Sequence, residues 1–449
     1  MSVLNNFSVS IAKGLRRLQK NDVTKPFLSS TKRRGSTSNK EDRPHLKMEK
    51  SLIVSKVTRF EYEKHSRENI SDDELERILR KRGSDYDAML QNHKEQKAFE
   101  ESVAKNMRDI GLKVEMASRC AKLGTIVETP ARLTYNDELI NWCDVVVPCG
   151  GDGTFLLAAS RVRDANKPVI GFNSSPQRSV GRLCLPTWCS NDVKGALHAL
   201  KEGKFKWLRR SRIRTTVSSV PKLLDKITPV DLHTLHYCRY PPVSHFQDTE
   251  CQPDHTDQDA PSSQLSTKVL PFLALNEVFI GESVTSRVSL LRLQIDNGKW
   301  TQTKSSGLCV TTGTGSTSWH FSINCLRTHS VLELMKILGK DFDVKLDTRL
   351  EKAREVAERY NQKLMFPPDS RQLAYSVREY ITFEEWPAPR GLRVRDSAAS
   401  VRVRSHCTDA GLVVDGSVSF PFNDGTEALL EIYPEDSLMT VQMDEALPH

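Results

Sequence analysis

Three features that would each define a class of protein are missing from this 449-residue sequence. No stretch approaches the roughly 18 consecutive apolar residues that a membrane-spanning helix needs, so we expect no membrane span. The ten cysteines form no C-x-x-C pair and show no metal-site spacing to histidine. We therefore expect reduced, partly buried thiols, with neither a disulfide framework nor a zinc site.

Two well-known glycine loops of nucleotide-binding proteins are absent as well. The sequence contains no G-x-x-x-x-G-K-S/T loop. It also lacks the G-x-G-x-x-G fingerprint, because the glycines at 150, 151 and 153 are not followed by a glycine at 156. This spacing weakens the case for a dehydrogenase that transfers a hydride.

Acidic residues are almost missing from the first 40 positions, which hold nine lysines and arginines and only Asp22 as an acid. The difference equals the net charge of +8, so the rest of the chain is neutral and offers no basic footprint for nucleic acid. The apolar side chains that share one face of a helical wheel here are Leu4, Phe7, Ile11, Leu15 and Leu18. Such a segment is typical of a mitochondrial transit peptide, which we predict for residues 1–45. The alternative is a disordered basic tail that touches anionic membranes or RNA.

The remainder of the chain divides into two parts with different periodicity. The first alternates strands and helices, at 51–57 (strand), about 64–108 (helix), 113–118 (strand), 145–148 (strand), 154–163 (helix), 169–172 (strand) and 192–203 (helix). This order predicts an α/β domain over residues 50–205 with a parallel, Rossmann-like sheet. Short segments that alternate apolar and polar residues predict a mostly antiparallel, β-rich domain over 206–435. We expect residues 436–449 to form a C-terminal tail.

Two insertions interrupt the β-rich domain. Residues 241–268 contain Pro, Asp and Ser and lack apolar periodicity, which predicts a loop. The spacing of His245, Cys251 and His255 within it is irregular, so a solvated loop is favoured over a metal cluster. Residues 329–368 carry opposite charges at i,i+4 spacing, which predicts an exposed helix. A helix that binds a partner is the alternative.

A glycine-rich segment follows the apolar run before Pro148. It reads Gly-Gly-Asp-Gly-Thr over 150–154 and precedes a helical stretch. Glycines let the backbone approach phosphate oxygens, and the free N–H groups of a helix start attract an anion. A carboxylate is repelled by phosphate, so Asp152 needs a use, either accepting a proton from an attacking hydroxyl or holding magnesium. The alternative is that Asp152 only caps the helix.

Four motifs in one order resemble those of NAD kinases. The G-G-D-G-T loop resembles one shared by NAD kinases, diacylglycerol and sphingosine kinases and, more distantly, phosphofructokinases. The segment 167–186, the pair Asn276-Glu277 and the T-G-T-G-S-T-S-W segment that starts at Thr312 resemble NAD kinases in particular. Trp319 and the tail VVDGSVSFPFNDG look like the mitochondrial type of that family. The resemblance implies the fold of NAD kinases, a homodimer and a place in the mitochondrial matrix.

The same resemblance implies roles for individual residues. Asp152 is expected to be the catalytic group, beside nucleotide contacts from Gly150, Gly151, Gly153 and Thr154. The further nucleotide contacts expected are Asn173, Asn276, Glu277, Lys304, Ser306, Thr314, Gly315, Ser316, Thr317, Ser318, Trp319 and Ser322. Many members carry an aspartate at the position of Ser306 and Ala-Tyr in place of Ser318-Trp319. Ser306 therefore leaves the contact on the nicotinamide side open.

Together these observations predict a kinase that transfers the γ-phosphoryl group of ATP to the 2′-hydroxyl of the adenosine ribose of NAD, giving NADP. The transition state is loose, so positioning and charge neutralisation matter more than early deprotonation of the alcohol. We expect magnesium to arrive on the phosphates of ATP, because the sequence offers no carboxylate cage nearby. The alternatives are a lipid kinase with the same glycine loop and a catalytically silent NADP-binding protein.

Overall fold

The computed structural model of the chain describes residues 44–118, 133–232, 265–381 and 392–445, apart from positions 66, 68, 69 and 343. The predicted transit peptide lies outside these ranges up to residue 43. The predicted loop lies outside them up to residue 264, including His245, Cys251 and His255. In the described part of the chain, no helix has the length and apolar character needed to cross a membrane.

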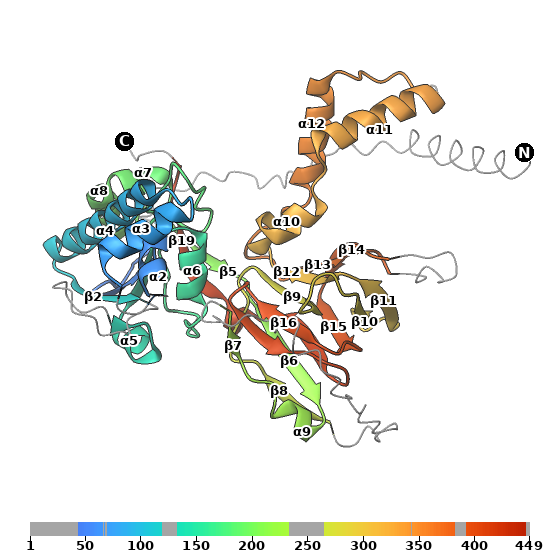
Figure 1. Cartoon of the computed structure of the whole chain (residues 1–449), viewed down its shortest axis with the longest axis horizontal. Helices are drawn as coiled ribbons and strands as arrows, with labels where there is room; N and C mark the ends of the chain where they lie inside the picture. Colours follow the sequence, from blue (N-terminus) through green and yellow to red (C-terminus); the bar gives the residue numbers. More distant parts are fainter. Residues whose placement is uncertain are drawn as a thin grey trace, which may run out of the picture. The chain divides into compact units, whose positions relative to one another are not determined.

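The N-terminal part builds a parallel sheet covered by helices (Figure 1). Its elements are, in order, β1 Lys50–Ser55, α2 Arg59–His65, α3 Asp72–Lys81, α4 Tyr86–Asp109, β2 Lys113–Ser118, β3 Leu133–Thr134, α5 Asp137–Trp142, β4 Val145–Cys149, α6 Asp152–Ala159, α7 Thr187–Asn191 and α8 Val193–Lys201. The strands hydrogen-bond in the order β3-β2-β1-β4, and each pair is parallel. The predicted α/β class with a parallel sheet is confirmed, because crossover segments return the chain to the same edge of the sheet.

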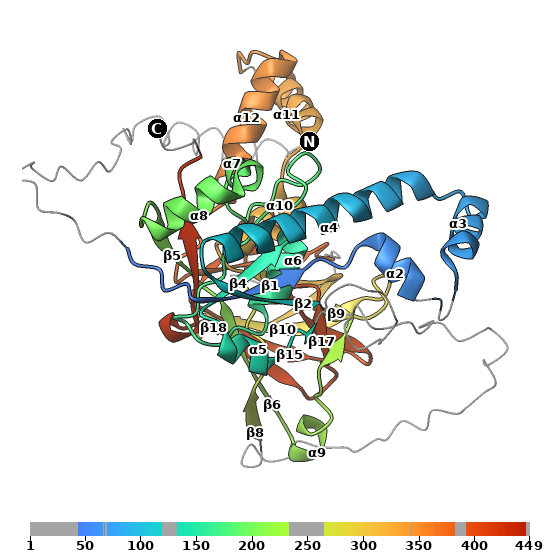
Figure 2. The same ribbon diagram turned by 90° about the vertical axis from the view of Figure 1, so that its left-hand side faces the viewer.

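Both faces of this sheet are buried, and successive side chains of a strand point to opposite faces. Ile53 and Val147 belong to a core with α4 and α8, whereas Leu52 and Val146 belong to a core with α5 and α6. Figure 2 shows α4 running across the strands β1 and β4. Burial on both faces explains why β4 is apolar without alternation.

Two predicted segments of this part differ from the structure. The single helix expected over about 64–108 is divided among α2, α3 and α4. Ser71 and Asp85 cap α3 and α4 with their side chains, and Gly83 between these helices has a positive φ of 79° that ends α3. The segment expected as a strand at 169–172 forms two isolated parallel bridges to β4. The N–H groups of Ile170 and Phe172 donate to β4 at 2.9 Å, and the N–H of Val169 donates on the other side to Met439.

The C-terminal part consists mainly of strands. Its elements are β5 Lys206–Arg210, β6 Ile213–Ser219, α9 Pro221–Leu224, β7 Val230–Asp231, β8 Ser266–Val269, β9 Glu277–Glu282, β10 Ser289–Ile295, β11 Thr301–Ser305, β12 Gly307–Thr311, η3 Gly315–Thr317, α10 Trp319–Asn324, α11 Thr328–Asp341, α12 Leu350–Gln362, β13 Leu373–Arg378, β14 Arg395–Ala398, β15 Ser400–Ser405, β16 Ala410–Val414, β17 Val418–Pro421, β18 Glu427–Ile432, η4 Pro434–Asp436 and β19 Leu438–Gln442.

Most of these strands form two antiparallel sheets. The strand order is β11-β10-β15-β18-β6-β8 in one sheet and β14-β13-β12-β9-β16-β17-β7 in the other. One core fills the space between them, with Leu291 and Val403 from the first sheet and Ile280 and Val310 from the second. Buried and partly exposed residues alternate along β6 and β15, as expected for strands with one face on a core. The predicted β-rich, mostly antiparallel class of this part is confirmed.

The end of the chain returns to the α/β part, which the sequence did not predict. Strand β19 lies in the segment expected to be a tail, and it pairs antiparallel with β5. Met439 forms a parallel bridge with Pro168, and Met443 packs in the core below α4 and α8. The segment differs from a tail because β19 is paired and buried, with Leu438 in the core of the α/β part and the hydroxyl of Thr440 donating to the backbone oxygen of Leu208 on β5. The predicted loop 241–268 likewise ends in residues of β8.

The second insertion forms two helices, α11 and α12, that pack against each other (Figure 1). Val331, Ala353 and Ala357 form a small core there. Arg354 pairs with Glu358, four residues further on, at 2.9 Å. The i,i+4 charge pairs are therefore present as predicted, although the insertion contains two helices where one was expected.

Candidate active site

The glycine loop connects the buried strand β4 to helix α6. Gly150 has no room for a side chain, because a Cβ there would collide with the hydroxyl of Thr154. Gly153 lies in the first turn of α6, and a Cβ there would meet no atom within 4 Å. Lys56, just beyond β1, lies beside Gly150 at the same edge of the sheet. The loop is thus closed by protein at Gly150 and open to a ligand at Gly153.

Asp152 is the first residue of α6 and is held by a neighbouring loop. Its Oδ1 accepts a hydrogen bond from the backbone N–H of Leu183 at 2.9 Å, and its Oδ2 accepts one from that of Arg182 at 3.2 Å. The N-cap position belongs to Gly151, and no side chain caps this helix. The alternative role of Asp152 as the helix cap is therefore wrong. Each carboxylate oxygen keeps a further lone pair for a ligand.

Arg210, which the sequence analysis did not single out, joins the two glycine-rich motifs. It ends β5 and donates from Nη1 to the hydroxyl of Thr314 at 3.3 Å. Burial lowers the pKa of Arg210 to about 10, and the nearby charge of Asp152 opposes that shift. Its buried Nε has no hydrogen-bond partner in the described part of the chain. The signal for it was slight, an arginine-rich strand over 206–214.

The second glycine-rich segment, 312–318, is a tight turn between β12 and α10. A Cβ on Gly315 would collide with the backbone oxygen of Asn276, so these two segments lie in direct contact. Ser316 and Thr317 donate their hydroxyls to backbone oxygens of the turn, at 2.6 and 3.3 Å. Thr314 and Ser316 are buried, whereas Thr317 is partly exposed. Most side chains of the motif therefore hold the turn, and Thr317 remains accessible to a ligand.

The predicted pair Asn276-Glu277 is fixed by a buried carboxylate. Asp415 accepts hydrogen bonds from the backbone N–H groups of Leu275, Asn276 and Glu277, at 2.8, 2.8 and 3.1 Å. The side-chain amide of Asn276 donates to the hydroxyl of Ser318 at 3.1 Å. Asn276 Oδ1 and Glu277 Oε2 are buried and accept no hydrogen bond from the described residues. Two buried acceptors of this kind suit a ligand that brings hydroxyl or amine donors.

Burial also sets the charge of this cluster. It raises the pKa of Glu277 to about 8, with the charge of Asp415 as a second cause. Burial likewise raises the pKa of Asp415 to about 6, although the three backbone N–H groups and Arg212 act in the opposite direction. Both carboxyl groups therefore hold protons more tightly than in water. Asp415 was missed by the sequence analysis, and its available signal was an Asp-Gly pair at a turn, where it has a φ of 47°.

Trp319 begins α10 and presents an aromatic surface near the same turn. Its ring centroid lies 4.5 Å from that of Phe279, and the guanidinium of Arg378 lies 6.0 Å from the Trp319 centroid. The residue is 37% exposed, so a flat ring of a ligand has access to it. Ser322 lies one turn further along α10, is exposed, and donates its hydroxyl to the backbone oxygen of Ser318 at 3.3 Å.

Ser306 lies next to Arg378 and beside a carboxylate. Its N–H donates to the backbone oxygen of Arg378 at 3.0 Å, and its hydroxyl donates to the carboxylate of Glu379. That hydrogen bond and the charge of Arg378 lower the pKa of Glu379. A carboxylate therefore lies beside position 306, where the resemblance to NAD kinases implies an aspartate and this chain has serine. Lys304 adjoins the same segment, because its backbone oxygen accepts the N–H of Ile381 at 2.8 Å. Glu379 was missed because 73 residues separate it from Ser306.

Asn173 shapes the loop 173–183 that holds Asp152. It is 2% exposed, its Nδ2 donates to the backbone oxygen of Ser179 at 2.9 Å, and its Oδ1 accepts from the N–H of Ser175 at 3.1 Å. Both ends of the amide are engaged within the loop. The structure thus places this predicted nucleotide contact in a supporting position.

A pocket of about 280 Å3 opens between these segments. Its lining includes Arg182 from the loop that holds Asp152, Thr317 and Phe321 from the second motif and α10, and Gln362 and Met365 at the end of α12. The helical insertion therefore contributes a wall beside both motifs, which its charge pattern did not predict.

Comparison with known proteins identifies the family of this chain. A family model described as the ATP-NAD kinase N-terminal domain matches residues 46–178. A Rattus norvegicus protein named "NAD kinase 2, mitochondrial" is 35% identical over 396 residues, which cover 88% of this chain and 87% of that protein. The Homo sapiens protein of the same name is 36% identical over 396 residues, covering 88% of this chain and 84% of that protein. Among solved structures, an NAD kinase from Archaeoglobus fulgidus in complex with ATP has a TM-score of 0.42 at 15% identity and covers 88% of this chain and 94% of that chain. Because both relatives exceed 30% identity over most of their length and of this chain, the chain belongs to the NAD kinase family.

Proposed function

We propose that this chain transfers the γ-phosphoryl group of ATP to the 2′-hydroxyl of the adenosine ribose of NAD, with Asp152 accepting the proton of that hydroxyl. The environment of Asp152 carries this proposal. Two backbone N–H groups hold its carboxylate at the start of α6, next to a glycine that faces open space. A carboxylate held in this way orients the hydroxyl and accepts its proton late in a loose transition state, without being a strong base.

Neighbouring groups supply the positive charge that phosphoryl transfer needs. Gly153 lets phosphate oxygens approach the N-terminus of α6. The Nε of Arg210 and the side chain of Lys56 are the cationic groups that we assign to the phosphates. Magnesium enters with ATP as a complex, since the described residues include no group of three or more His, Cys, Asp or Glu side chains able to hold a metal ion.

We place the adenosine ribose of NAD at the pair Asn276-Glu277. The buried oxygens Asn276 Oδ1 and Glu277 Oε2 accept no hydrogen bond from the described residues. Ribose hydroxyls would donate hydrogen bonds to them. Trp319 is positioned to stack on a base, and Glu379 beside Ser306 offers a carboxylate on the nicotinamide side.

Two other functions make different predictions in one assay. A lipid kinase with the same loop has no use for buried acceptors that match ribose, and a silent NADP-binding protein has no use for an oriented Asp152. The purified chain is incubated with ATP, magnesium and either NAD or diacylglycerol. Formation of NADP supports the proposal, whereas a phosphorylated lipid, or no product from NAD, contradicts it.

From the resemblance to NAD kinases we further infer a homodimer, and we infer a place in the mitochondrial matrix. The amphipathic basic segment at 1–45 and the word mitochondrial in the names of both relatives support import. Fusing residues 1–45 to a fluorescent reporter tests this, and a diffuse cytosolic signal would contradict it. Light scattering on the purified chain gives the mass in solution, and a monomeric mass would contradict the dimer.

A further inference from the structure

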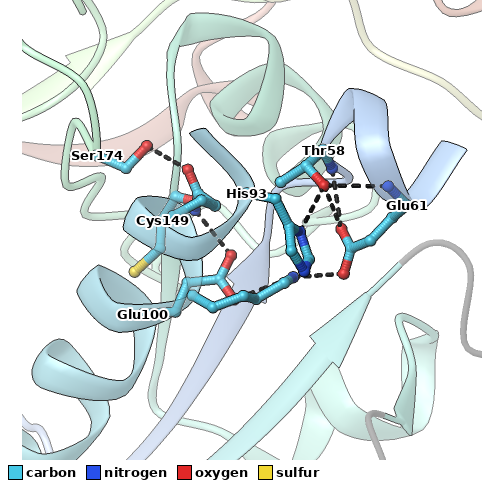
Figure 3. Close-up of polar contacts among 8 residues, drawn as sticks. Thr58, Glu61, His93, Glu100, Cys149 and Ser174 are labelled. Carbon is cyan, nitrogen blue, oxygen red and sulfur yellow. Dashed lines mark hydrogen bonds and ion pairs between the residues drawn. The ribbon is translucent and has the colours of Figure 1, made fainter. Parts of the chain in front are cut away.

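A buried polar cluster lies behind the glycine loop and includes none of the predicted site residues (Figure 3). At its centre is Gln96 of α4, which is 3% exposed. Its Nε2 donates to the backbone oxygen of Cys149 at 3.1 Å and to Oε1 of Glu100 at 2.7 Å, and its Oε1 accepts from the hydroxyl of Ser174 at 2.5 Å. Both amide hydrogens have an acceptor, which fixes the orientation of the amide.

The partners of Gln96 belong to the two segments that form the walls of the glycine loop. Cys149 ends β4 and directly precedes Gly150, and Ser174 lies at the start of the loop 173–183. These segments also contact each other, since the N–H of Ser174 donates to the backbone oxygen of Gly150 at 3.4 Å. One side-chain amide therefore joins the end of β4 to the start of this loop.

The other end of the loop 173–183 binds the catalytic candidate. Arg182 and Leu183 supply the two N–H groups that hold the carboxylate of Asp152. The position of Asp152 is thus defined from two directions, through β4 and the glycine loop, and through the loop 173–183. Gln96 hydrogen-bonds to the start of both segments, to Cys149 before the glycine loop and to Ser174 in the loop 173–183.

Glu100 is fully buried and accepts a hydrogen bond from the amide of Gln96. Two ion pairs, both made by Lys97, connect Glu100 to helix α2. Oε2 of Glu100 lies 3.6 Å from Nζ of Lys97, and Lys97 lies 2.5 Å from Oε1 of Glu61 on α2. Glu61 accepts hydrogen bonds from the N–H and the hydroxyl of Thr58, at 2.9 and 3.2 Å, and Nδ1 of His93 lies 2.9 Å from that hydroxyl. Figure 3 shows this row of polar side chains behind the loop. A buried carboxyl group is destabilising unless it has partners, and Gln96 and Lys97 of α4 are the partners that surround Glu100 here.

We propose that Gln96, oriented by Glu100, is a positioning residue for phosphoryl transfer that fixes the glycine loop against the loop 173–183 and so sets where Asp152 stands. The inference rests on the proposed function, because Asp152 is the group that is positioned. Packing alone does not account for the cluster, since an apolar side chain of similar volume fills such a site without needing partners.

The test is Gln96→Met in the full chain, which keeps the side-chain volume and removes all three hydrogen bonds. We expect kcat for NADP formation to fall about tenfold or more, with the KM for ATP and for NAD changed less than about twofold, because displacing a catalytic carboxylate affects mainly the transition state. The matched control is Gln91→Met on the exposed side of the same helix, where Gln91 donates to Glu95 at 3.0 Å. That variant removes a Gln–Glu contact of the same spacing between two exposed side chains and keeps Glu95, which lies 3.6 Å from Arg178 of the loop 173–183, so we expect wild-type kcat.

A charge-swapped variant separates positioning from stability. In Gln96→Glu with Glu100→Gln, the hydrogen bond between positions 96 and 100 is restored, but position 96 has no N–H for the backbone oxygen of Cys149. We expect the melting temperature to recover relative to Gln96→Glu alone, while kcat stays low. Recovery of kcat together with the melting temperature, or wild-type kcat in folded Gln96→Met, would overturn the inference. The wild-type chain in the same assay reports on the proposed function separately, since a loss confined to the Gln96 variants concerns positioning alone.

Discussion

The two glycine-rich segments of this molecule use glycine for opposite purposes. After β4, Gly153 faces open space, and the carboxylate of Asp152 is held beside it. After β12, Gly315 lies against the backbone of Asn276 and leaves no room for a Cβ. The first loop keeps space for a ligand, whereas the second brings two strand ends into contact. The difference fits our proposal that phosphoryl transfer takes place at the first loop, while the second loop fixes the backbone around it.

The carboxyl groups near the two glycine-rich segments differ in their exposure to solvent. Asp152 is partly exposed and takes two backbone N–H groups from a loop. Glu277 and Asp415 are buried beside the second segment, and burial raises the pKa of both. A partly exposed carboxylate is available to a substrate hydroxyl, while buried ones respond to pH and bind a ligand only through unpaired oxygens. Substitutions at each segment can therefore separate loss of turnover from loss of binding or stability.

Asp152→Asn should have the largest effect. Asparagine keeps one oxygen for the N–H groups of the neighbouring loop but accepts no proton, so we expect turnover to fall about 10²-fold or more with nucleotide binding retained. The matched control is Asp144→Asn, because Asp144 also takes two backbone N–H groups, from Glu49 and Lys50, at the opposite edge of the sheet. NADP formation and calorimetric binding measure the two quantities. Near-normal turnover for Asp152→Asn would reduce Asp152 to a structural residue.

Gly315→Ala and Gly153→Ala test the contrast between the glycines directly. We expect Gly315→Ala to lower the free energy of unfolding by about 3 kcal/mol, because a backbone oxygen cannot move aside for the new methyl group. Gly153→Ala should unfold like the wild type but raise the KM for ATP about tenfold, because the methyl group occupies the space that phosphate needs. Equal melting temperatures for the two variants would contradict the difference in packing between Gly315 and Gly153.

Glu277→Ala tests whether the second segment binds NAD. Removing the unpaired carboxyl group should raise the NAD requirement about tenfold, close to 1.4 kcal/mol, with little change for ATP. The melting temperature and the NAD affinity of the variant are measured together. A lower melting temperature with unaltered NAD affinity would remove Glu277 from the site and weaken the case for NAD over a lipid acceptor.

Glu277→Gln should show its effect in the pH dependence of stability. The pKa of Glu277 is about 8 in the folded chain against 4.5 as the reference value, so the folded state holds more protons between these pH values. The free energy of unfolding therefore falls as pH rises through this window. Between about pH 6 and pH 8, the free energy of unfolding of the wild type should decrease with rising pH. The decrease in the variant should be smaller by about 2 kcal/mol, because glutamine does not titrate. Parallel curves from urea unfolding would show that Glu277 does not titrate in this range.

Local patterns were predicted well because periodicity depends on neighbours in sequence. Alternation over 398–405 and 428–433 predicted strands close to β15 and β18, and the apolar run before Pro148 predicted β4. The single helix expected over 64–108 failed although Ser71 and Gly83 carry signals for a helix start and a helix end. The charged composition continues across both signals, and it predicted one helix where these signals divide the stretch.

The sequence by itself determined the fold class, the glycine loop with Asp152, and the resemblance that led to the family. Only the tertiary structure decided how the site is held together. Asp415 meets the N–H of Glu277 across 138 residues, and Gln96 meets Cys149 across 53. Such contacts depend on which sheet edge and which helix face come together, and that is set by burial of whole elements rather than by spacing along the chain. The chemistry of this protein is therefore visible in its motifs, and the placement of its reacting groups is visible only in the fold.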